Sequence, residues 1–447
     1  MRSLISRALF VAGASALAVA SAQAGGFDRG GVQVDLLFDP ARIATEAGVT
    51  YVSPQRELKN VQRATSSTDP LADRIRAGLI ARGIDRDRAT GVANSLRRPP
   101  LFSGSVEVEG DYAVPRLGAK FNIFEPVDCL ATYTQPYGAD ADYGTNNAYS
   151  PTAVEFEVDS HDFGLTCSYK FDLAGGQFRV IGGTSYQQLD AYLARQTLLD
   201  FGNEGIGTFE LSDEAWSYRV GAAYEIPEIA LRALVLYSGR YEYDLTGTVD
   251  TTGFGPTGTV LAPLPGPFSP FSPRLTTGVF DVDAQTEIPQ ALDIRLQSGL
   301  AEGLLGFVNI RWQDWSQLQR VRINGVVSPA TGQVSPTTSF DAFYEDGWTV
   351  TAGLGKKFTD TFSGLASVTW DKGTSTFYGS QTDVYTVALG GSYTPTENVE
   401  LRFGGSVGVL TGGRSDFIAE QDPANYVSYE FDADTVVAGS ASIKVKF

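Results

Sequence analysis

The sequence predicts an all-β protein, a 14-stranded antiparallel transmembrane β-barrel with a short N-terminal plug segment. Three observations indicate this fold. The chain opens with an export signal, its tight and long connections alternate, and its strands alternate apolar and polar residues. A β-sandwich has no reason to sort its loops in this way. Outer-membrane barrels have short periplasmic turns and longer external loops.

The first 24 residues, MRSLISRALFVAGASALAVASAQA, form a predicted signal peptide. Arg2 and Arg7 give a basic start, residues 8–20 are apolar, and AQA at 22–24 is a small-residue cleavage site. The apolar run is shorter than the ~20 residues that a spanning helix needs. We expect the exported chain to begin near Gly25 and any membrane span to be made of strands.

Predicted connections alternate between tight and long from residue 46 to the end of the chain. The tight ones lie near 124–125, 174–176, 227–229, 301–302, 359–360 and 396–398. The long ones are 59–109, 139–151, 196–214, 248–286, 324–345, 374–382 and 411–433. This alternation and the even number of strands are typical of outer-membrane barrels.

Residues in the predicted strands alternate with a period of two, which places every second side chain on one face of a sheet. In VELRFGGSVGV (399–409), Phe403 belongs to the apolar face and Arg402 to the polar one. In LRALVLYSGRYEYDL (231–245), Tyr241 and Tyr243 are predicted to share the apolar face with Val235. If the apolar face meets lipid, the polar face lines the lumen.

The chain therefore divides into a signal peptide (1–24), a plug segment (25–44) and a barrel (45–447). The longest external loops are 59–109 and 248–286. The first loop contains apolar residues at helical spacing, including Leu79, and predicts one or two amphipathic helices. The last strand ends at Phe447, and a terminal aromatic residue of this kind is the usual recognition signal for the outer-membrane assembly machinery.

Composition excludes several classes of protein. The net charge of -18 argues against nucleic acid as a partner. The two cysteines, Cys129 and Cys167, are predicted to lie side by side at the periplasmic end of adjacent strands. A disulfide is therefore expected, with two free thiols as the alternative.

An enzyme is not expected. His161 is the only histidine, and a strand would point its neighbours Ser160 and Asp162 to the opposite face, so these three residues do not predict a catalytic triad. The acidic residues near it are scattered, as solvated residues usually are, and predict no metal site. Those residues are Asp140, Asp142, Asp159 and Asp162. No cofactor is predicted.

Four stretches together make the chain resemble the outer-membrane long-chain fatty-acid transporter family, which is FadL-like and includes hydrocarbon-uptake members. They are FDPARIATEAGVTYVSP, LATYTQPYGADADYG, IPQALDIRL and FVNIRWQDWSQLQ. The first resembles the family's Asn-Pro-Ala hatch end and first strand. The second resembles its third strand, where a kink opens the barrel wall. The others resemble its Pro-led strand and its Trp-Ser-Gln strand.

The resemblance implies a passive monomeric channel of the Gram-negative outer membrane that takes up hydrophobic molecules, long-chain fatty acids in particular. Cargo would enter a lumenal pocket and leave sideways into the lipid. The implied plug or gate is Phe38, Asp39, Pro40 and Ala41, and the implied lateral opening is Gln135, Pro136, Tyr137 and Gly138. Asp39 stands where the family has Asn, and Pro40 cannot donate a backbone hydrogen bond.

Alternatives remain for the ligand site and for the function. Arg311, inward by parity beside Phe307, is the candidate for a fatty-acid carboxylate, because Arg binds carboxylates through two nitrogens. Internal ion pairs that brace the barrel are the competing interpretation. The competing functions are a general porin for polar solutes, a hydrocarbon-uptake channel of the same family, and an assembly or adhesion barrel. An apolar lumen with a pocket would favour hydrophobic cargo.

Overall fold

A computed structural model of the chain describes residues 26–63, 70–95, 101–198, 204–254, 278–325, 338–416 and 426–447. The predicted signal peptide lies outside these ranges. So does the proline-rich stretch at 261–275 in the second long loop. The predictions for these two segments therefore stay predictions.

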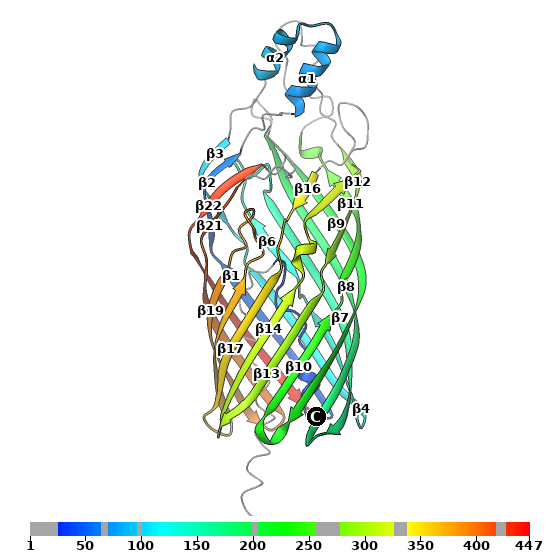
Figure 1. The fold of residues 1–447 in the computed structure, drawn as a ribbon, viewed down its shortest axis with the longest axis vertical. Helices are drawn as coiled ribbons and strands as arrows, with labels where there is room; N and C mark the ends of the chain where they lie inside the picture. Colours follow the sequence, from blue (N-terminus) through cyan, green and yellow to red (C-terminus); the bar gives the residue numbers. More distant parts are fainter. Residues whose placement is uncertain are drawn as a thin grey trace, which may run out of the picture.

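The described strands form a closed, 14-stranded antiparallel barrel (Figure 1). Its first strand, β1 (Ile43–Pro54), pairs with the last strand, β23 (Asp434–Lys446), on one side and with β4 (Tyr112–Phe124) on the other. The sheet therefore has no open edge at the point where the chain ends meet. The predicted fold class is confirmed.

Five of the strands are interrupted once, so the barrel sheet contains 19 strand segments. The interrupted strands are β5/β6, β10/β11, β12/β13, β14/β15 and β16/β17. The bounds after β4 are β5 (Val127–Thr134), β6 (Gly138–Asp142), β7 (Glu155–Leu173), β8 (Gly176–Leu198), β9 (Glu204–Ile226), β10 (Leu231–Ser238), β11 (Tyr241–Asp250), β12 (Val279–Ile288), β13 (Ala291–Ala301), β14 (Leu304–Gln313), β15 (Arg320–Asn324), β16 (Thr338–Asp341), β17 (Gly347–Lys357), β18 (Phe362–Lys372), β19 (Val384–Thr396) and β20 (Val399–Leu410).

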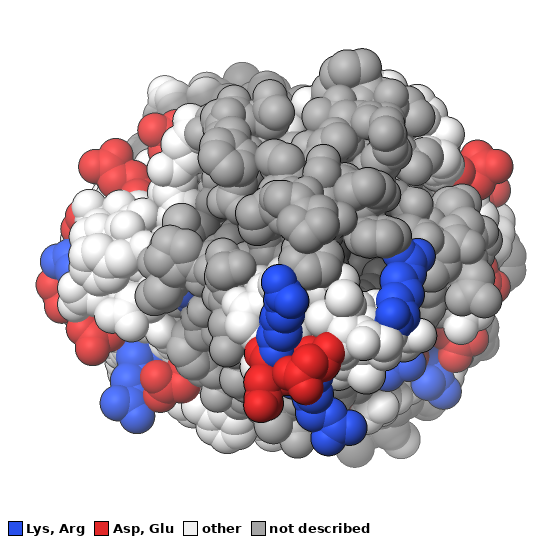
Figure 2. All heavy atoms as spheres, turned by 90° about the horizontal axis from the view of Figure 1, so that it is seen from above, with Lys and Arg blue, Asp and Glu red and all other residues white. Residues whose placement is uncertain are grey.

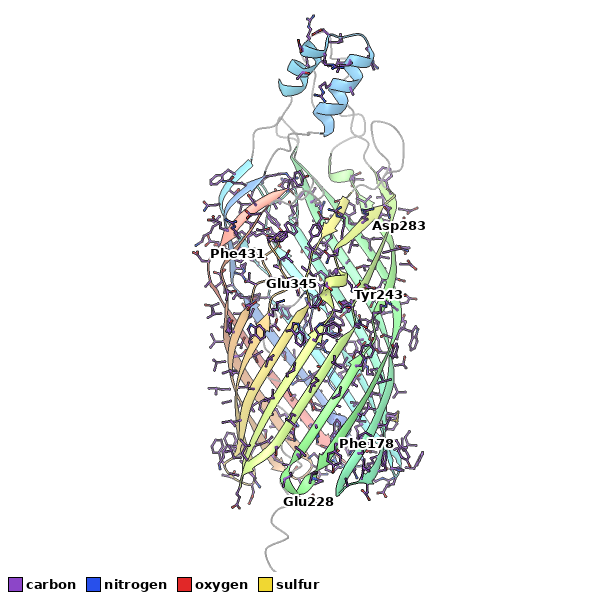
Figure 3. All side chains as sticks on the ribbon, in the orientation of Figure 1. Phe178, Glu228, Tyr243, Asp283, Glu345 and Phe431 are labelled. Atoms are coloured by element: carbon purple, nitrogen blue, oxygen red, sulfur yellow. A yellow bond between two sulfur atoms is a disulfide. The ribbon has the colours of Figure 1, made fainter. Side chains whose placement is uncertain are left out.

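The predicted tight connections are confirmed, and they gather at one end of the barrel (Figure 1). Phe178 and Glu228 lie at this end, whereas Asp283 and Phe431 lie towards the opposite end (Figure 3). The long connections rise from that opposite end. We call it the long-loop end, and the other the tight-turn end.

A second, four-stranded sheet lies at the long-loop end. It contains β2 (Arg56–Arg63), β3 (Leu101–Val108), β21 (Gly413–Ser415) and β22 (Val427–Phe431). Above it lie α1 (Pro70–Ala81) and α2 (Arg86–Ser95), which confirm the predicted helices (Figure 1). Neither of these described helices has the length and apolar character that a membrane crossing requires. Seen from above, described side chains of both charges lie along the rim (Figure 2).

Four short 3₁₀ helices lie among the described residues. They are η2 (Asp35–Phe38), η3 (Pro227–Ile229), η4 (Thr252–Phe254) and η6 (Trp315–Gln317). The first belongs to the segment that precedes β1, and the last separates β14 from β15.

The apolar faces of the strands point outward over the predicted segment 399–409, where Phe403 is 51% exposed and Arg402 is buried. The prediction for Tyr241 and Tyr243 is wrong, since both are buried and point into the barrel. Ser238 lies opposite Arg219 of β9, and Thr246 lies opposite Ser212. The chain advances eight residues between the first pair and the second, whereas β9 advances seven, so the interruption between β10 and β11 adds one residue. One added residue moves every later side chain to the other face.

The predicted connections 196–214 and 248–286 are too long. β8 extends to Leu198, β9 begins at Glu204, and β12 begins at Val279. In the upper part of β9, Phe209 is buried and Glu210 is exposed. There the outward face is acidic instead of apolar, so the sequence resembles a polar loop although it forms a strand.

The predicted disulfide is present. Cys129 on β5 lies directly opposite Cys167 on β7, and the two sulfur atoms are bonded. The bridge joins two adjacent strands below the interruption between β5 and β6.

Replacing both cysteines by serine should lower the thermal stability of the folded barrel. The bridge closes a loop with a sequence separation of 38 residues. Chain-entropy arguments give such a loop about 4 kcal/mol of stabilisation. The measurement is the heat-induced mobility shift on gels, with reduced wild-type protein as the control. A wild-type chain that reacts with maleimide without reductant would contradict the bridge.

Candidate functional site

The segment before β1, residues 26–42, lies against inward-facing side chains of the barrel. Val34 and Leu37 are fully buried, and Phe38 is 4% exposed. They form one apolar cluster with inward residues such as Leu130 and Leu236. Burial of this kind fixes the segment inside the lower lumen.

The predicted plug residues end this segment. The Phe38 ring lies 4.3 Å from the guanidinium carbon of Arg232. Asp39 is buried and accepts an ion pair from Lys444 Nζ at 3.2 Å. The carbonyl of Ala41 accepts a hydrogen bond from Lys120 Nζ at 2.5 Å, whereas Pro40 is exposed. Charged lumenal groups thus hold the end of the segment.

Two further ion pairs hold its beginning and middle. Arg311 Nε lies 2.6 Å from Asp28 Oδ2, and Arg295 Nη1 lies 2.9 Å from Asp35 Oδ2. Gly31 has a φ of +58°, and a Cβ there would lie 2.6 Å from the Arg311 guanidinium carbon. Glycine therefore allows the close approach as well as the backbone conformation.

The third strand is kinked between β5 and β6, at the predicted residues 135–138. β5 pairs with β4 as far as Thr134, which lies opposite Arg116. Beyond that pair, β6 is hydrogen-bonded to β7. On the edge of β6 that faces away from β7, the one β-bridge of a β6 residue among the described residues joins Asp142 to Glu109. The wall therefore lacks a ladder beside the kink.

Residues 27–29 pair with the kink in place of the missing ladder. The backbone N–H of Arg29 donates to the carbonyl of Pro136 at 2.7 Å. The N–H of Gly138 donates to the carbonyl of Phe27 at 2.8 Å. Backbone groups that the interruption would leave unpaired are thereby satisfied.

The Arg29 side chain fills the same gap. Its guanidinium pairs with Asp140 and, at 3.1 Å, with Asp159, and it lies 4.6 Å from the centre of the Tyr112 ring. A Cβ on Gly138 would lie 2.2 Å from the Arg29 guanidinium carbon. The absence of a side chain at Gly138 thus makes room for this arginine.

Ser160 fixes the kink from the other side. Its Oγ accepts a hydrogen bond from the Tyr137 N–H at 2.9 Å and donates to the Tyr137 carbonyl at 2.6 Å. His161 points to the outer face and lies 2.9 Å from the Tyr133 hydroxyl. Ser160 and His161 therefore lie on opposite faces, as predicted.

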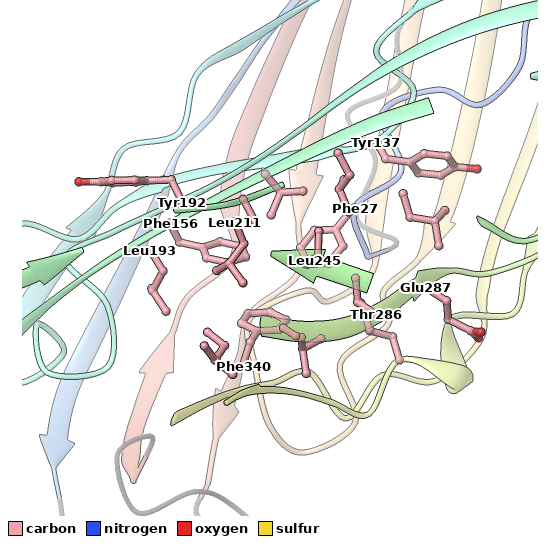
Figure 4. A pocket seen from close by; sticks show the side chains of 18 residues that line it. Phe27, Tyr137, Phe156, Tyr192, Leu193, Leu211, Leu245, Thr286, Glu287 and Phe340 are labelled. Atoms are coloured by element: carbon pink, nitrogen blue, oxygen red, sulfur yellow. The ribbon is translucent and has the colours of Figure 1, made fainter. Parts of the chain in front are cut away.

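An apolar cavity of about 740 Å³ lies on the long-loop side of the kink (Figure 4). The cavity is lined by Phe27, Tyr137, Phe156, Val158, Leu189, Ala191, Tyr192, Leu193, Leu211, Leu245, Ala284, Thr286, Glu287, Ile288, Leu318, Val321, Ile323 and Phe340. Apart from Thr286 and Glu287, these side chains offer an apolar ligand no charged or strongly polar contact.

Aromatic rings surround Phe27, where the N-terminal segment meets the cavity. Its ring centre lies 5.8 Å from that of Trp315, 5.9 Å from that of Phe340 and 6.1 Å from that of Tyr344. Trp315 also packs edge-on against Tyr137. The cavity, the N-terminal segment and the kink thus share one packed cluster.

The connection between β6 and β7 adds aromatic residues nearer the long-loop end. Tyr149 stacks on Tyr143 at 4.2 Å and lies 5.7 Å from Tyr429 of β22. Burial raises the pKa of both Tyr143 and Tyr149. Both phenols therefore stay neutral at physiological pH and bring no charge to the apolar cluster that they share with the cavity.

The tight-turn half of the lumen is charged. Asp128 accepts ion pairs from Lys120 at 2.9 Å and from Arg179 at 3.0 Å. Glu225 joins Arg179 at 2.8 Å and Arg232 at 3.0 Å. An apolar molecule moving straight through the barrel would have to separate these pairs, which is strongly unfavourable.

Arg311 and Phe307 do not line the apolar cavity. The Arg311 guanidinium is engaged by Asp28, by Asp293 at 2.7 Å and by Gln313 at 3.3 Å. Sequence parity identified Arg311 as inward, but its partner Asp28 is 283 residues away and carries no local signal. Arg29 was missed for the same reason. Over the described ranges, no group of His, Cys, Asp or Glu could hold a metal ion.

A closed barrel with an apolar outer face and an apolar internal cavity defines the class of outer-membrane channels that transport hydrophobic compounds. The chain belongs to the outer membrane protein transport protein family (OMPP1/FadL/TodX), whose sequence model matches residues 37–443. It is therefore a transporter of the Gram-negative outer membrane and not an enzyme. A search of curated protein sequences found no match.

Solved structures share the fold at low identity. A FadL homologue of Pseudomonas aeruginosa is 13% identical, with a TM-score of 0.70 and 92% of each chain covered. The Ralstonia pickettii toluene transporter TbuX is 11% identical, with a TM-score of 0.58 and 95% of each chain covered. The Pseudomonas putida toluene transporter TodX is 12% identical, with a TM-score of 0.57 and 96% of each chain covered.

Filling the cavity should block transport of hydrophobic cargo. Ala284 lines the cavity and is 1% exposed, so Ala284→Trp would occupy part of the space that cargo needs. We expect at least tenfold slower uptake of labelled oleate or toluene by cells that depend on this protein. Ala441→Trp on the outer face of β23 is the matched control. Unchanged uptake in an assembled Ala284→Trp barrel would show that cargo bypasses the cavity.

Proposed function

We propose that this protein passively imports long-chain fatty acids, which enter the apolar cavity and leave through the wall at the kink of the third strand. The observation that carries the proposal is the apolar cavity, two of whose lining residues, Phe27 and Tyr137, belong to the N-terminal segment and to the kink. Cargo in the cavity therefore contacts both parts that would have to move.

The contents of the lumen favour this route over a general porin. The N-terminal segment and the ion pairs of Asp128 and Glu225 occupy the tight-turn half. A lateral exit avoids these ion pairs. It also avoids returning an acyl chain to water, which is unfavourable by about 0.8 kcal/mol per CH₂.

The segment before β1, residues 26–42, acts as the plug in this proposal, and residues 27–29 act as the gate, since residues 43 and 44 of the predicted plug belong to β1. Phe38, Asp39, Pro40 and Ala41 stay anchored by lumenal arginine and lysine side chains, while residues 27–29 leave the kink. Support comes from what closes the gap, which is a set of contacts made by residues 27–29 and not a strand ladder. They are two backbone hydrogen bonds, the ion pairs of Arg29, the Asp28–Arg311 pair and the ring contacts of Phe27. A switch of this size can open and close without unfolding the barrel.

Uptake of labelled oleate by cells that lack their own transporter tests the cargo. Expression of this protein should restore uptake. Asp39→Ala should change the rate of oleate uptake, because the variant leaves Lys444 without one of its two carboxylate partners and loosens the plug. Heat-modifiable mobility shows that each variant has assembled.

Hydrocarbon uptake is the second candidate function, favoured by the nearly complete absence of charge from the described lining of the cavity. Toluene uptake without oleate uptake would select it. An assembled wild-type barrel that transports neither compound would reject both proposals.

A disulfide trap tests the gate. Asp28 and Tyr137 form an antiparallel bridge, so Asp28→Cys with Tyr137→Cys places two thiols opposite each other. The native cysteines are replaced by serine in this background. Oxidation should stop uptake and a reductant should restore it, because the cross-link holds residues 27–29 on the kink. The single-cysteine variants are the controls, and full uptake by the cross-linked protein would contradict the gate.

A further inference from the structure

A second cavity, of about 600 Å³, lies on the tight-turn side of the kink. The N-terminal segment contributes Val32 and Leu36 to its lining, and the barrel contributes Leu130 and Arg116. Arg116 forms the last β4–β5 pair, with Thr134, before the kink begins. This cavity therefore adjoins the interrupted wall, on the opposite side of the kink from the apolar cavity.

One face of the second cavity is apolar and the other carries two guanidinium groups. Arg116 donates no hydrogen bond to any described residue, and its Nε lies 3.7 Å from Glu46 Oε1. Arg402 is 6% exposed and uses Nε for Glu400 and Nη1 for Glu46, but its buried Nη2 has no hydrogen-bond partner. Buried donors without partners are rare because each is unfavourable by about 1–3 kcal/mol. The site thus has more donors than acceptors.

The acidic groups around the two arginines are already engaged. Glu46 is shared by Arg116 and Arg402, and Glu400 is shared by Arg402 and Lys444. Asp35, which also lines the cavity, pairs with Arg295. What the site lacks is therefore an acceptor, and an acceptor with two oxygens suits the planar guanidinium best.

We propose that Arg116 and Arg402 form a binding site for the carboxylate of an acidic amphiphile. The inference rests on the proposed uptake function and deepens it, since the site selects fatty acids over uncharged hydrocarbons. The acyl chain follows Val32, Leu36 and Leu130 towards the interrupted wall. The carboxylate stays on the arginines until the chain is in the lipid.

The physical reason is the environment of the exit. A charged group in hydrocarbon is unfavourable unless it is paired. A hydrocarbon crossing the wall has no such group, but a fatty acid does. A guanidinium pair next to the gap removes this obstacle for acids and gives hydrocarbons no advantage.

The test compares oleate with methyl oleate, which has the same chain without the charge. Binding to purified full-length protein in amphipol is measured for the wild type and Arg116→Gln. The variant should bind oleate at least about tenfold more weakly, as expected for loss of a charged hydrogen bond, and methyl oleate unchanged. Glu46→Gln should bind oleate more tightly, because a competing carboxylate is removed.

The control variant is Arg414→Gln, which removes an exposed arginine paired with Asp416, and neither residue lines either cavity. Cells should show the same selectivity, so that Arg116→Gln slows oleate uptake and leaves toluene uptake unchanged. If the wild type transports no oleate, the proposed function fails. If it does and Arg116→Gln transports oleate equally well, only the arginine site fails.

Dodecyl phosphate distinguishes cargo from a membrane lipid as the source of the anion. Displacement of oleate by dodecyl phosphate in the wild type, with both bound weakly by Arg116→Gln, agrees with a site that reads anionic oxygens and serves acidic cargo. Dodecyl phosphate binding that depends on Arg116, together with oleate binding that does not, would assign the site to a lipid headgroup and overturn the proposal.

Discussion

Backbone hydrogen bonding within a bilayer is the constraint on which the rest of this structure depends. Hydrocarbon offers no partner to a free N–H or C=O, so a membrane sheet must pair within itself. At the kink of the third strand, β6 has moved away from β4, and residues 27–29 supply partners from inside the barrel. The same segment therefore fills the lumen and completes the wall. A movement that frees the kink from this segment changes both at once.

The two halves of the lumen differ in polarity. The long-loop half contains a cavity that suits hydrophobic cargo, and the tight-turn half contains ion pairs such as Asp128 with Lys120. Buried ion pairs resist separation because each charge left alone is strongly unfavourable. On the proposed lateral route, an apolar molecule that reaches Phe27 leaves the pairs of Asp128 and Glu225 intact, and the pairs of Arg29 with Asp140 and Asp159 open instead.

Sequence patterns predicted the tight turns and the inward position of Arg311, since these depend on neighbouring residues, whereas the place of the kink was implied by the family resemblance. They could not predict the inward faces of Tyr241 and Tyr243, because a single added residue between β10 and β11 reverses the alternation. Contacts between residues that are far apart in the sequence could not be predicted either. Arg29 meets Asp140 and Asp159 only after the barrel has closed around the segment.

Asp39 shows how a departure from the family's Asn is accommodated. A buried carboxylate is several kcal/mol unfavourable unless it is paired. Lys444 lies 3.2 Å away and Lys446 3.7 Å away, and Glu400 holds Lys444 from the other side at 2.8 Å. Both lysines belong to β23, the last strand, which closes the barrel against β1. Closure of the barrel therefore helps to fix the end of the segment before β1, because it brings both lysines to Asp39.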